Sequence, residues 1–128
     1  MNSQVENWMN SACYDLETAE HMFSSKRYIY TVFMCHLAIE KILKANIQQK
    51  HKKNPSKIHD LTRLLFISDV NISEEQKIFL TEIGNLSVNI RYPEDFPALV
   101  RTFDKTRVER ILLKSRGVFQ CILKSLKS

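Results

Sequence analysis

The chain has 128 residues and a hydrophobic fraction of 44%, which predicts one soluble domain over 1–128 whose core needs no disulfide staples. Its net charge of +5 permits a nucleotide or nucleic-acid partner, although lysines that only solvate helix faces would give the same value. Only two glycines occur, which disfavours a hairpin-rich β protein and excludes Gly-rich phosphate loops of the Walker A or Rossmann type.

Two long helices are predicted in the first half of the chain. Apolar residues recur at spacings of three and four over 3–23, which is typical of a helix with one buried face. The stretch 28–50 predicts a second helix whose first half is apolar on nearly all sides, as expected of a central helix with several neighbours. Its polar end, QQKHKK, is expected to project into water. Pro55 then ends the helix, because it disfavours helical backbone at Asn54.

Further apolar stripes of the same spacing predict helices over 58–68, from Ser73 to a stop at Pro93, and over 104–126. Ser73 and Gln76 have the spacing of a capping box, which marks the start of the fourth helix. The stretch 92–103 is expected to be a loop. Five helices, four of them long, predict an all-α fold: an antiparallel up-and-down bundle of four to five helices.

Charged residues lie beside the most apolar part of the chain, in the stretch HLAIEKILKA of 36–45. Here His36, Glu40, Lys41 and Lys44 recur at about helical spacing and share a side of the helix. One interpretation is a favourable i,i+4 pair of Glu40 with Lys44 and a core histidine satisfied by a neighbour. The other is that these groups face a cleft or a partner, since burying them otherwise is costly.

A second candidate site is the break at VNIRYPEDFPAL, where Pro93 leaves Arg91 and Tyr92 at a helix end. Arginine offers a fork for a phosphate, and tyrosine offers a stacking face for a base. Alternatively, Tyr92 packs under the loop and Arg91 pairs with Glu94 or Asp95. If the second and fourth helices pack antiparallel, one cleft is expected to gather the candidates of both segments, namely Arg91, Tyr92, Glu40, Lys41, Lys44 and His36.

The histidines predict no metal site. No two of them have the spacing of a helical metal pair, so neither a metal nor another cofactor is expected. His59 begins the third predicted helix, where it either caps that helix with Asp60 or joins the ligand site. In the empty cleft, Glu40 is expected to hold the guanidinium of Arg91.

The cysteines and the apolar runs predict the compartment. Cys13, Cys35 and Cys121 are odd in number, far apart, and without metal-ligand spacing, which is typical of a reduced, cytoplasmic protein. Cys35 precedes His36, but adjacent helical residues point about 100° apart, so the two are not a ready catalytic pair. The sequence shows neither a signal-peptide pattern nor an apolar run that predicts a membrane span.

Four stretches together resemble the HEPN domain family (higher eukaryotes and prokaryotes nucleotide-binding). They are Trp8 with ACYDLETA from Ala12, YIYTVFMCHLAIEKILKA from Tyr28, IHDLTRLL from Ile58, and RYP from Arg91. Their order and spacing cover most of the chain. The resemblance implies an antiparallel bundle of four to five helices, a homodimer, and binding of a nucleotide or RNA. A homodimer is also favoured by the second predicted helix, which is apolar on more sides than one small bundle easily covers.

The resemblance also bears on catalysis. Many HEPN proteins resemble ribonucleases, often toxins whose antitoxin is a small nucleotidyltransferase, and their signature is an arginine followed four to six residues later by a histidine. Arg91 matches the arginine, but the window holds Phe96, Pro97 and Ala98. A noncatalytic nucleotide- or RNA-binding module is therefore favoured. Two alternatives stay open: a metal-independent ribonuclease with a displaced histidine (His36 or His59), and a toxin-antitoxin partner of a nucleotidyltransferase.

Overall fold

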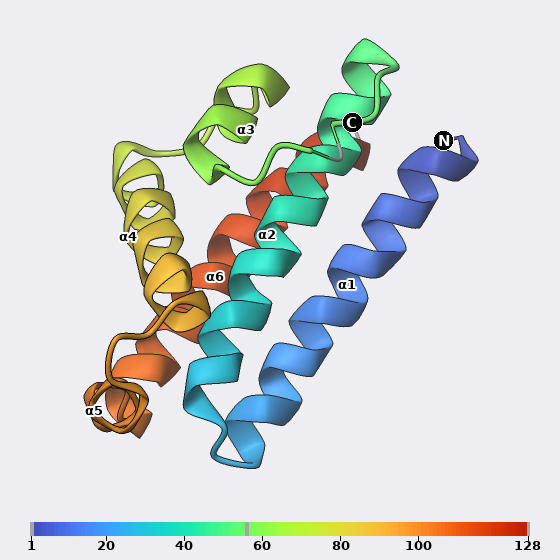
Figure 1. The fold of residues 1–128 in the computed structure, drawn as a ribbon. Coiled ribbons are helices and arrows are strands. Elements are labelled where there is room, and N and C mark those ends of the chain that lie inside the picture. Colours follow the sequence, from blue (N-terminus) through green and yellow to red (C-terminus); the bar gives the residue numbers. More distant parts are fainter. Residues whose placement is uncertain (1, 56, 128) are drawn as a thin grey trace.

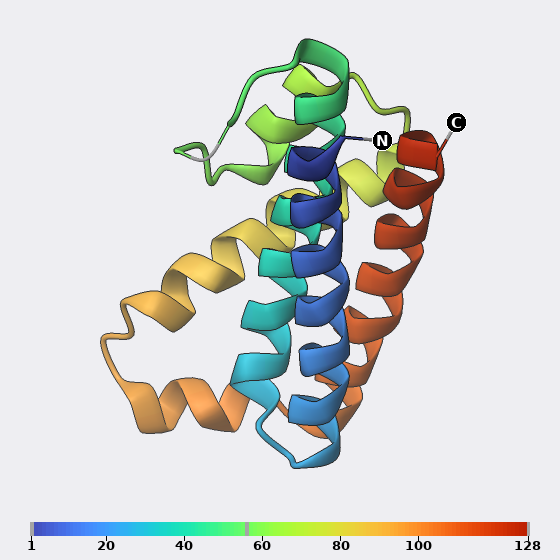
Figure 2. The same ribbon diagram turned by 90° about the vertical axis from the view of Figure 1, so that its right-hand side faces the viewer.

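The computed structural model describes residues 2–55 and 57–127, and over them it contains helices and no strands (Figure 1). In chain order the helices are α1 Ser3–Ser24, α2 Tyr28–His51, α3 Leu61–Ser68, α4 Glu74–Arg91, α5 Phe96–Thr102 and α6 Lys105–Lys127. The four long helices alternate in direction, so both chain ends lie at the same end of the molecule (Figures 1 and 2). The predicted all-α, up-and-down bundle is confirmed.

Local capping signals explain where the helices near the site begin. The predicted capping box is present at α4: the Ser73 hydroxyl accepts from the Gln76 N–H, and the Gln76 side chain accepts from the Ser73 N–H. Helix α3 starts three residues later than predicted, because the Asp60 carboxylate accepts from the Thr62 N–H and forms the cap. The side chain of Asp60 supplies this cap, so the His59 imidazole does not have to.

Helix α2 is the centre of the bundle. It packs against α1, α6, α3 and α4, as its apolar surface predicts. Its polar end begins later than expected: Gln48 is buried and donates to Gln4, whereas 49–53 are exposed. One copy of the chain already covers α2, so the apolar surface of this helix does not argue for pairing of two copies.

The stretch 92–103 is not a continuous loop as predicted. It contains α5, which Asp95 caps by accepting from the Ala98 N–H, with Pro97 in the first turn. Proline fits there because the first-turn N–H groups have no helical partner. Helix α4 ends at Arg91, two residues before Pro93, as predicted. None of the helices in 2–55 and 57–127 is long and apolar enough to span a membrane.

Candidate functional site

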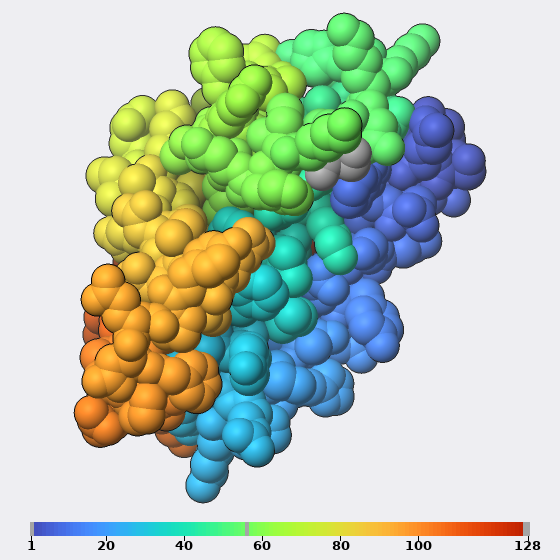
Figure 3. Space-filling view, viewed as in Figure 1, coloured from blue at the N-terminus to red at the C-terminus, as the bar shows by residue number. Residues whose placement is uncertain are grey.

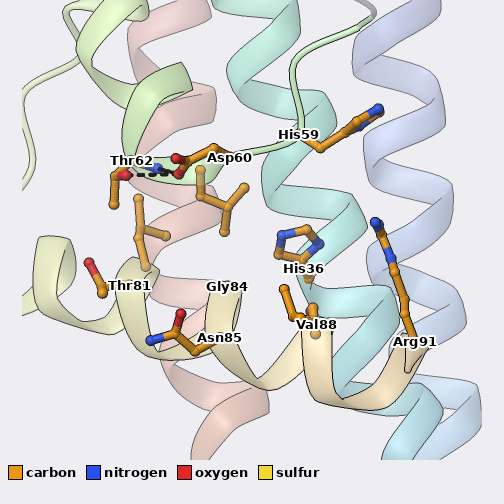
Figure 4. Close-up of a pocket in the computed structure, with 12 residues that line it drawn as sticks. His36, His59, Asp60, Thr62, Thr81, Gly84, Asn85, Val88 and Arg91 are labelled. Atoms are coloured by element: carbon orange, nitrogen blue, oxygen red, sulfur yellow. Dashed lines mark hydrogen bonds between the residues drawn. The ribbon is translucent and has the colours of Figure 1, made fainter. Parts of the chain in front are cut away.

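A pocket of about 440 Å³ lies between α2, the start of α3, and α4 (Figure 4). Helix α2 contributes His36, the segment before α3 contributes His59, and α4 contributes Arg91. The remaining lining residues are Asp60, Leu61, Thr62, Leu80, Thr81, Gly84, Asn85, Ser87 and Val88. The pocket therefore combines one permanent cation and one carboxylate with two titratable rings and several neutral polar groups.

Glu40 is the centre of a buried polar cluster next to this pocket. Its side chain is nearly inaccessible, and its Oε2 atom lies 2.9 Å from Lys44 Nζ and 3.0 Å from His59 Nδ1. Lys44 is one turn further along α2 and only 2% exposed. The predicted i,i+4 pair is thus present, but both of its charges are buried. A buried ion pair differs from an exposed one because removal of either partner leaves the other as an uncompensated buried charge.

His36 lies one turn before Glu40 and is also buried, at 4% exposure. Its Nδ1 is 4.0 Å from Glu40 Oε1, which is beyond hydrogen-bond reach. Burial lowers the pKa of His36 to about 4, with Glu40 opposing and Arg91 adding to the decrease. The imidazole is therefore neutral at pH 7. Neither His36 Nδ1 nor Glu40 Oε1 has a hydrogen-bond partner among the described residues.

Arg91 is the exposed last residue of α4. Its guanidinium carbon lies 5.3 Å from the centre of the Phe33 ring, a cation–π contact. Figure 4 shows the side chain extending alongside His36 in the direction of His59. Within 2–55 and 57–127 it forms no ion pair, so neither the expected contact with Glu40 nor the alternative pairing with the loop carboxylates is present. Glu40 Oε2 is instead occupied by Lys44 and His59.

Two predicted site residues lie elsewhere. Lys41 faces α1, where its Nζ is 2.8 Å from both Asp15 Oδ2 and Ser11 Oγ. It follows Glu40 directly, so its side chain points about 100° away around the helix. Tyr92 is 76% exposed and lines a separate surface pocket beside α5. The expected single cleft is therefore present only in part: His36, His59 and Arg91 line one pocket, and Glu40 and Lys44 form a buried pair that does not line it. Lys41 and Tyr92 lie elsewhere.

Sequence reasoning missed the contribution of α4 before its last residue. Thr81, Asn85, Val88 and Arg91 recur at spacings of four and three, so one face of this helix lines the pocket. That periodicity was available from the sequence. Ser87 is buried on the same pocket wall, and its hydroxyl has no partner among the described residues.

The geometry provides two kinds of chemistry. Arg91 presents guanidinium N–H groups that suit an anion, above all a phosphate. His59 is held at Nδ1 by a carboxylate, which leaves Nε2 facing away from Glu40, where it can accept or donate a proton. Asp60, whose carboxylate belongs to the pocket lining, is turned to Thr62 (Figure 4), and the hydrogen bonds from Thr62 lower the pKa of Asp60. The described residues contain no cluster of three or more potential metal ligands.

Comparison with known proteins gives one family and one fold. The family model described as HEPN domain matches residues 5–126. No curated protein matches the sequence. The crystal structure of TT1696 from Thermus thermophilus is similar over 97% of this chain and 99% of that chain, with a TM-score of 0.82 and 19% identity. At that identity the likeness shows the fold alone.

Proposed function

The chain belongs to the HEPN domain family, and we propose that the pocket between α2, α3 and α4 binds the phosphate of a nucleotide or RNA strand. One observation carries this proposal: Arg91 lines the pocket beside His36 and His59, and it has no acidic partner in the described part of the chain. A guanidinium in that setting keeps its hydrogen-bond donors for a ligand. Phosphate oxygens match the planar fork of those donors.

The charge balance around Glu40 supports an anionic ligand. Its carboxylate would repel a phosphate, but Lys44 lies 2.9 Å away and offsets the negative charge. His36 is neutral at pH 7 and adds no charge. His59 donates from Nδ1 to Glu40, so its exposed Nε2 donates to an anion when the ring is protonated. The carboxylate of Asp60 also lines the pocket but accepts hydrogen bonds from Thr62, so Arg91 is the charged group that faces an incoming anion.

Replacing Arg91 with alanine is expected to weaken the binding of short single-stranded RNA by roughly ten- to a hundredfold, the worth of a charge-assisted hydrogen bond. Stability should change little, because the side chain is exposed. Calorimetric titration measures the affinity, and thermal melts measure stability. Arg101→Ala is the matched control, since Arg101 is exposed on α5 and does not line the pocket. Equal affinity in both variants would remove Arg91 from the site.

A second candidate function, metal-independent RNA cleavage, is favoured by one contact. The 3.0 Å contact of Glu40 with His59 orients a ring that could take the proton of a ribose 2′-hydroxyl as its oxygen attacks the adjacent phosphorus. The bond to the 5′-oxygen then breaks, and that oxygen needs a proton in turn. His36 is a poor donor for it because burial holds its pKa at about 4. We therefore favour binding over cleavage.

Single-stranded RNA incubated with the protein in EDTA is accordingly expected to stay intact over hours, as judged by denaturing gel electrophoresis. The physical reason is the lack of a second proton-transfer group matched to neutral pH. If cleavage does occur, and His59→Ala abolishes it while the exposed-site control His21→Ala does not, the chain is an enzyme and the binding-only proposal is wrong.

Three broader proposals rest on family membership or, for the compartment, on the scattered cysteines. They are pairing of two copies, partnership with a small nucleotidyltransferase as part of a toxin-antitoxin system, and a cytoplasmic setting.

A further inference from the structure

Another pocket, of about 350 Å³, lies between the first two turns of α1, the end of α2 and Asn54, which follows that helix. Its lining consists of one hydroxyl, four carboxamides and one indole, from Ser3, Gln4, Asn7, Gln48, Asn54 and Trp8. No charged side chain is among them. A set of this kind suits a flat, neutral, polar ring better than it suits a phosphate.

Gln48 indicates that the pocket is built for a ligand. Its side chain is 3% exposed, and its Nε2 donates to Gln4 Oε1 at 2.9 Å. The Oε1 atom of Gln48 is buried and has no partner among the described residues. An orphaned buried acceptor is costly, and an apolar side chain at this position would avoid the cost. A bound group that donates a hydrogen bond would remove it.

Trp8 is the aromatic side chain of this pocket. Lys44 Nζ lies 5.3 Å from the centre of its ring, and the indole also lines the pocket. Any of the nucleobases can stack on an indole ring, because each has a π-face. A carboxamide carries a donor and an acceptor side by side, the arrangement that pairs with the N6 and N7 edge of adenine.

We propose that this pocket binds a nucleobase, stacked on Trp8 and hydrogen-bonded by the amide of Gln48, from the same RNA strand whose phosphate contacts Arg91. The inference rests on the function proposed above and specifies its ligand as a base-bearing strand. Lys44 lies between the two sites, because it contacts Glu40 as well as the Trp8 ring. Figure 3 shows α1, α2 and the end of α4 side by side on one face, with the segment that leads into α3 lying over α2 next to the first turns of α1.

Trp8 is the chain's single tryptophan, so the intrinsic tryptophan fluorescence reports on the surroundings of this one indole. The test titrates the protein with triadenylate RNA and with an abasic trimer of the same sugar-phosphate backbone. Triadenylate is expected to quench Trp8, whereas the abasic trimer should bind more weakly, by about tenfold, without quenching. Arg91→Ala should weaken both ligands yet leave the quenching by saturating triadenylate intact.

The variant Gln48→Met separates a ligand role from a structural one. It keeps the packing volume and removes the orphaned acceptor, and the exposed Gln4 that loses its hydrogen bond can bond to water, so stability should stay equal or rise. The affinity for triadenylate should fall about tenfold. Gln49→Met, the same change at the exposed neighbouring residue, should leave affinity unchanged. Triadenylate could bind without quenching Trp8, and Gln48→Met could keep full affinity for it. That result would overturn the base pocket but leave the phosphate site. Equal quenching by the abasic trimer would also overturn it, and absence of binding by either trimer would overturn both proposals.

Discussion

Replacing Glu40 with alanine is expected to lower the free energy of unfolding by roughly 3–5 kcal/mol, because it leaves a buried charge without its counter-ion. Lys44 is 2% exposed and would lose the carboxylate that lies 2.9 Å from its Nζ. His59 would lose its contact with Glu40 at the same time. Against a total stability of about 5–15 kcal/mol for a domain, this loss is large. Urea denaturation followed by circular dichroism measures it.

Two control variants make this expectation specific. Glu17→Ala removes an exposed carboxylate from α1, whose nearest basic partner is 3.8 Å away, and should change stability by no more than about 0.5 kcal/mol. The double change of Glu40→Leu with Lys44→Met replaces both buried charges by apolar groups and should recover most of the loss. If Glu40→Ala costs less than about 1 kcal/mol, the cluster is hydrated and the charge balance proposed for the pocket does not hold.

The second large effect is a dependence of stability on pH that His36 causes. Burial lowers the pKa of His36 from 6.5 to about 4, so the unfolded chain takes up a proton there at a higher pH than the folded chain does. The free energy of unfolding should therefore be highest above about pH 6.5 and fall as the pH decreases toward 4. This difference in the pKa of His36 between the unfolded and the folded chain corresponds to a loss of about 3 kcal/mol in the free energy of unfolding.

Urea titrations at intervals between pH 7 and pH 4 measure this loss. His36→Gln removes the titrating ring, so the free energy of unfolding should decrease less between pH 7 and pH 4. The decrease that remains comes from carboxylates. His21→Gln, at an exposed position of α1, should retain the slope of the unsubstituted protein. Parallel curves for all three proteins would show that His36 is solvated in the folded state.

The fold was predictable because its signals are local. Apolar stripes at helical spacing and the capping box of Ser73 depend on residues close in sequence, and they place four long helices correctly. Helix α5 was missed because it has only seven residues and contains Pro97, although proline is compatible with a first turn.

Only the part of the candidate site that lies on a single helix was predictable from the sequence. His36, Glu40 and Lys44 share a face of α2 by spacing alone, whereas Lys41 belongs to the neighbouring face, which a central helix also buries against α1. The contact between Glu40 and His59 could not be predicted, because it depends on how the segment before α3 crosses α2. Contacts of that kind are set by tertiary packing and leave no local pattern.

The position of Lys44 between Glu40 and the Trp8 ring has a consequence for the energetics of the two pockets. A ligand that displaces the ammonium from either contact changes the environment that the other pocket offers. Thermodynamic reciprocity then requires that each ligand alter the affinity for the other by the same factor. The two pockets would act as one cooperative unit, in which a strand that occupies both gains or loses affinity beyond the sum of its parts.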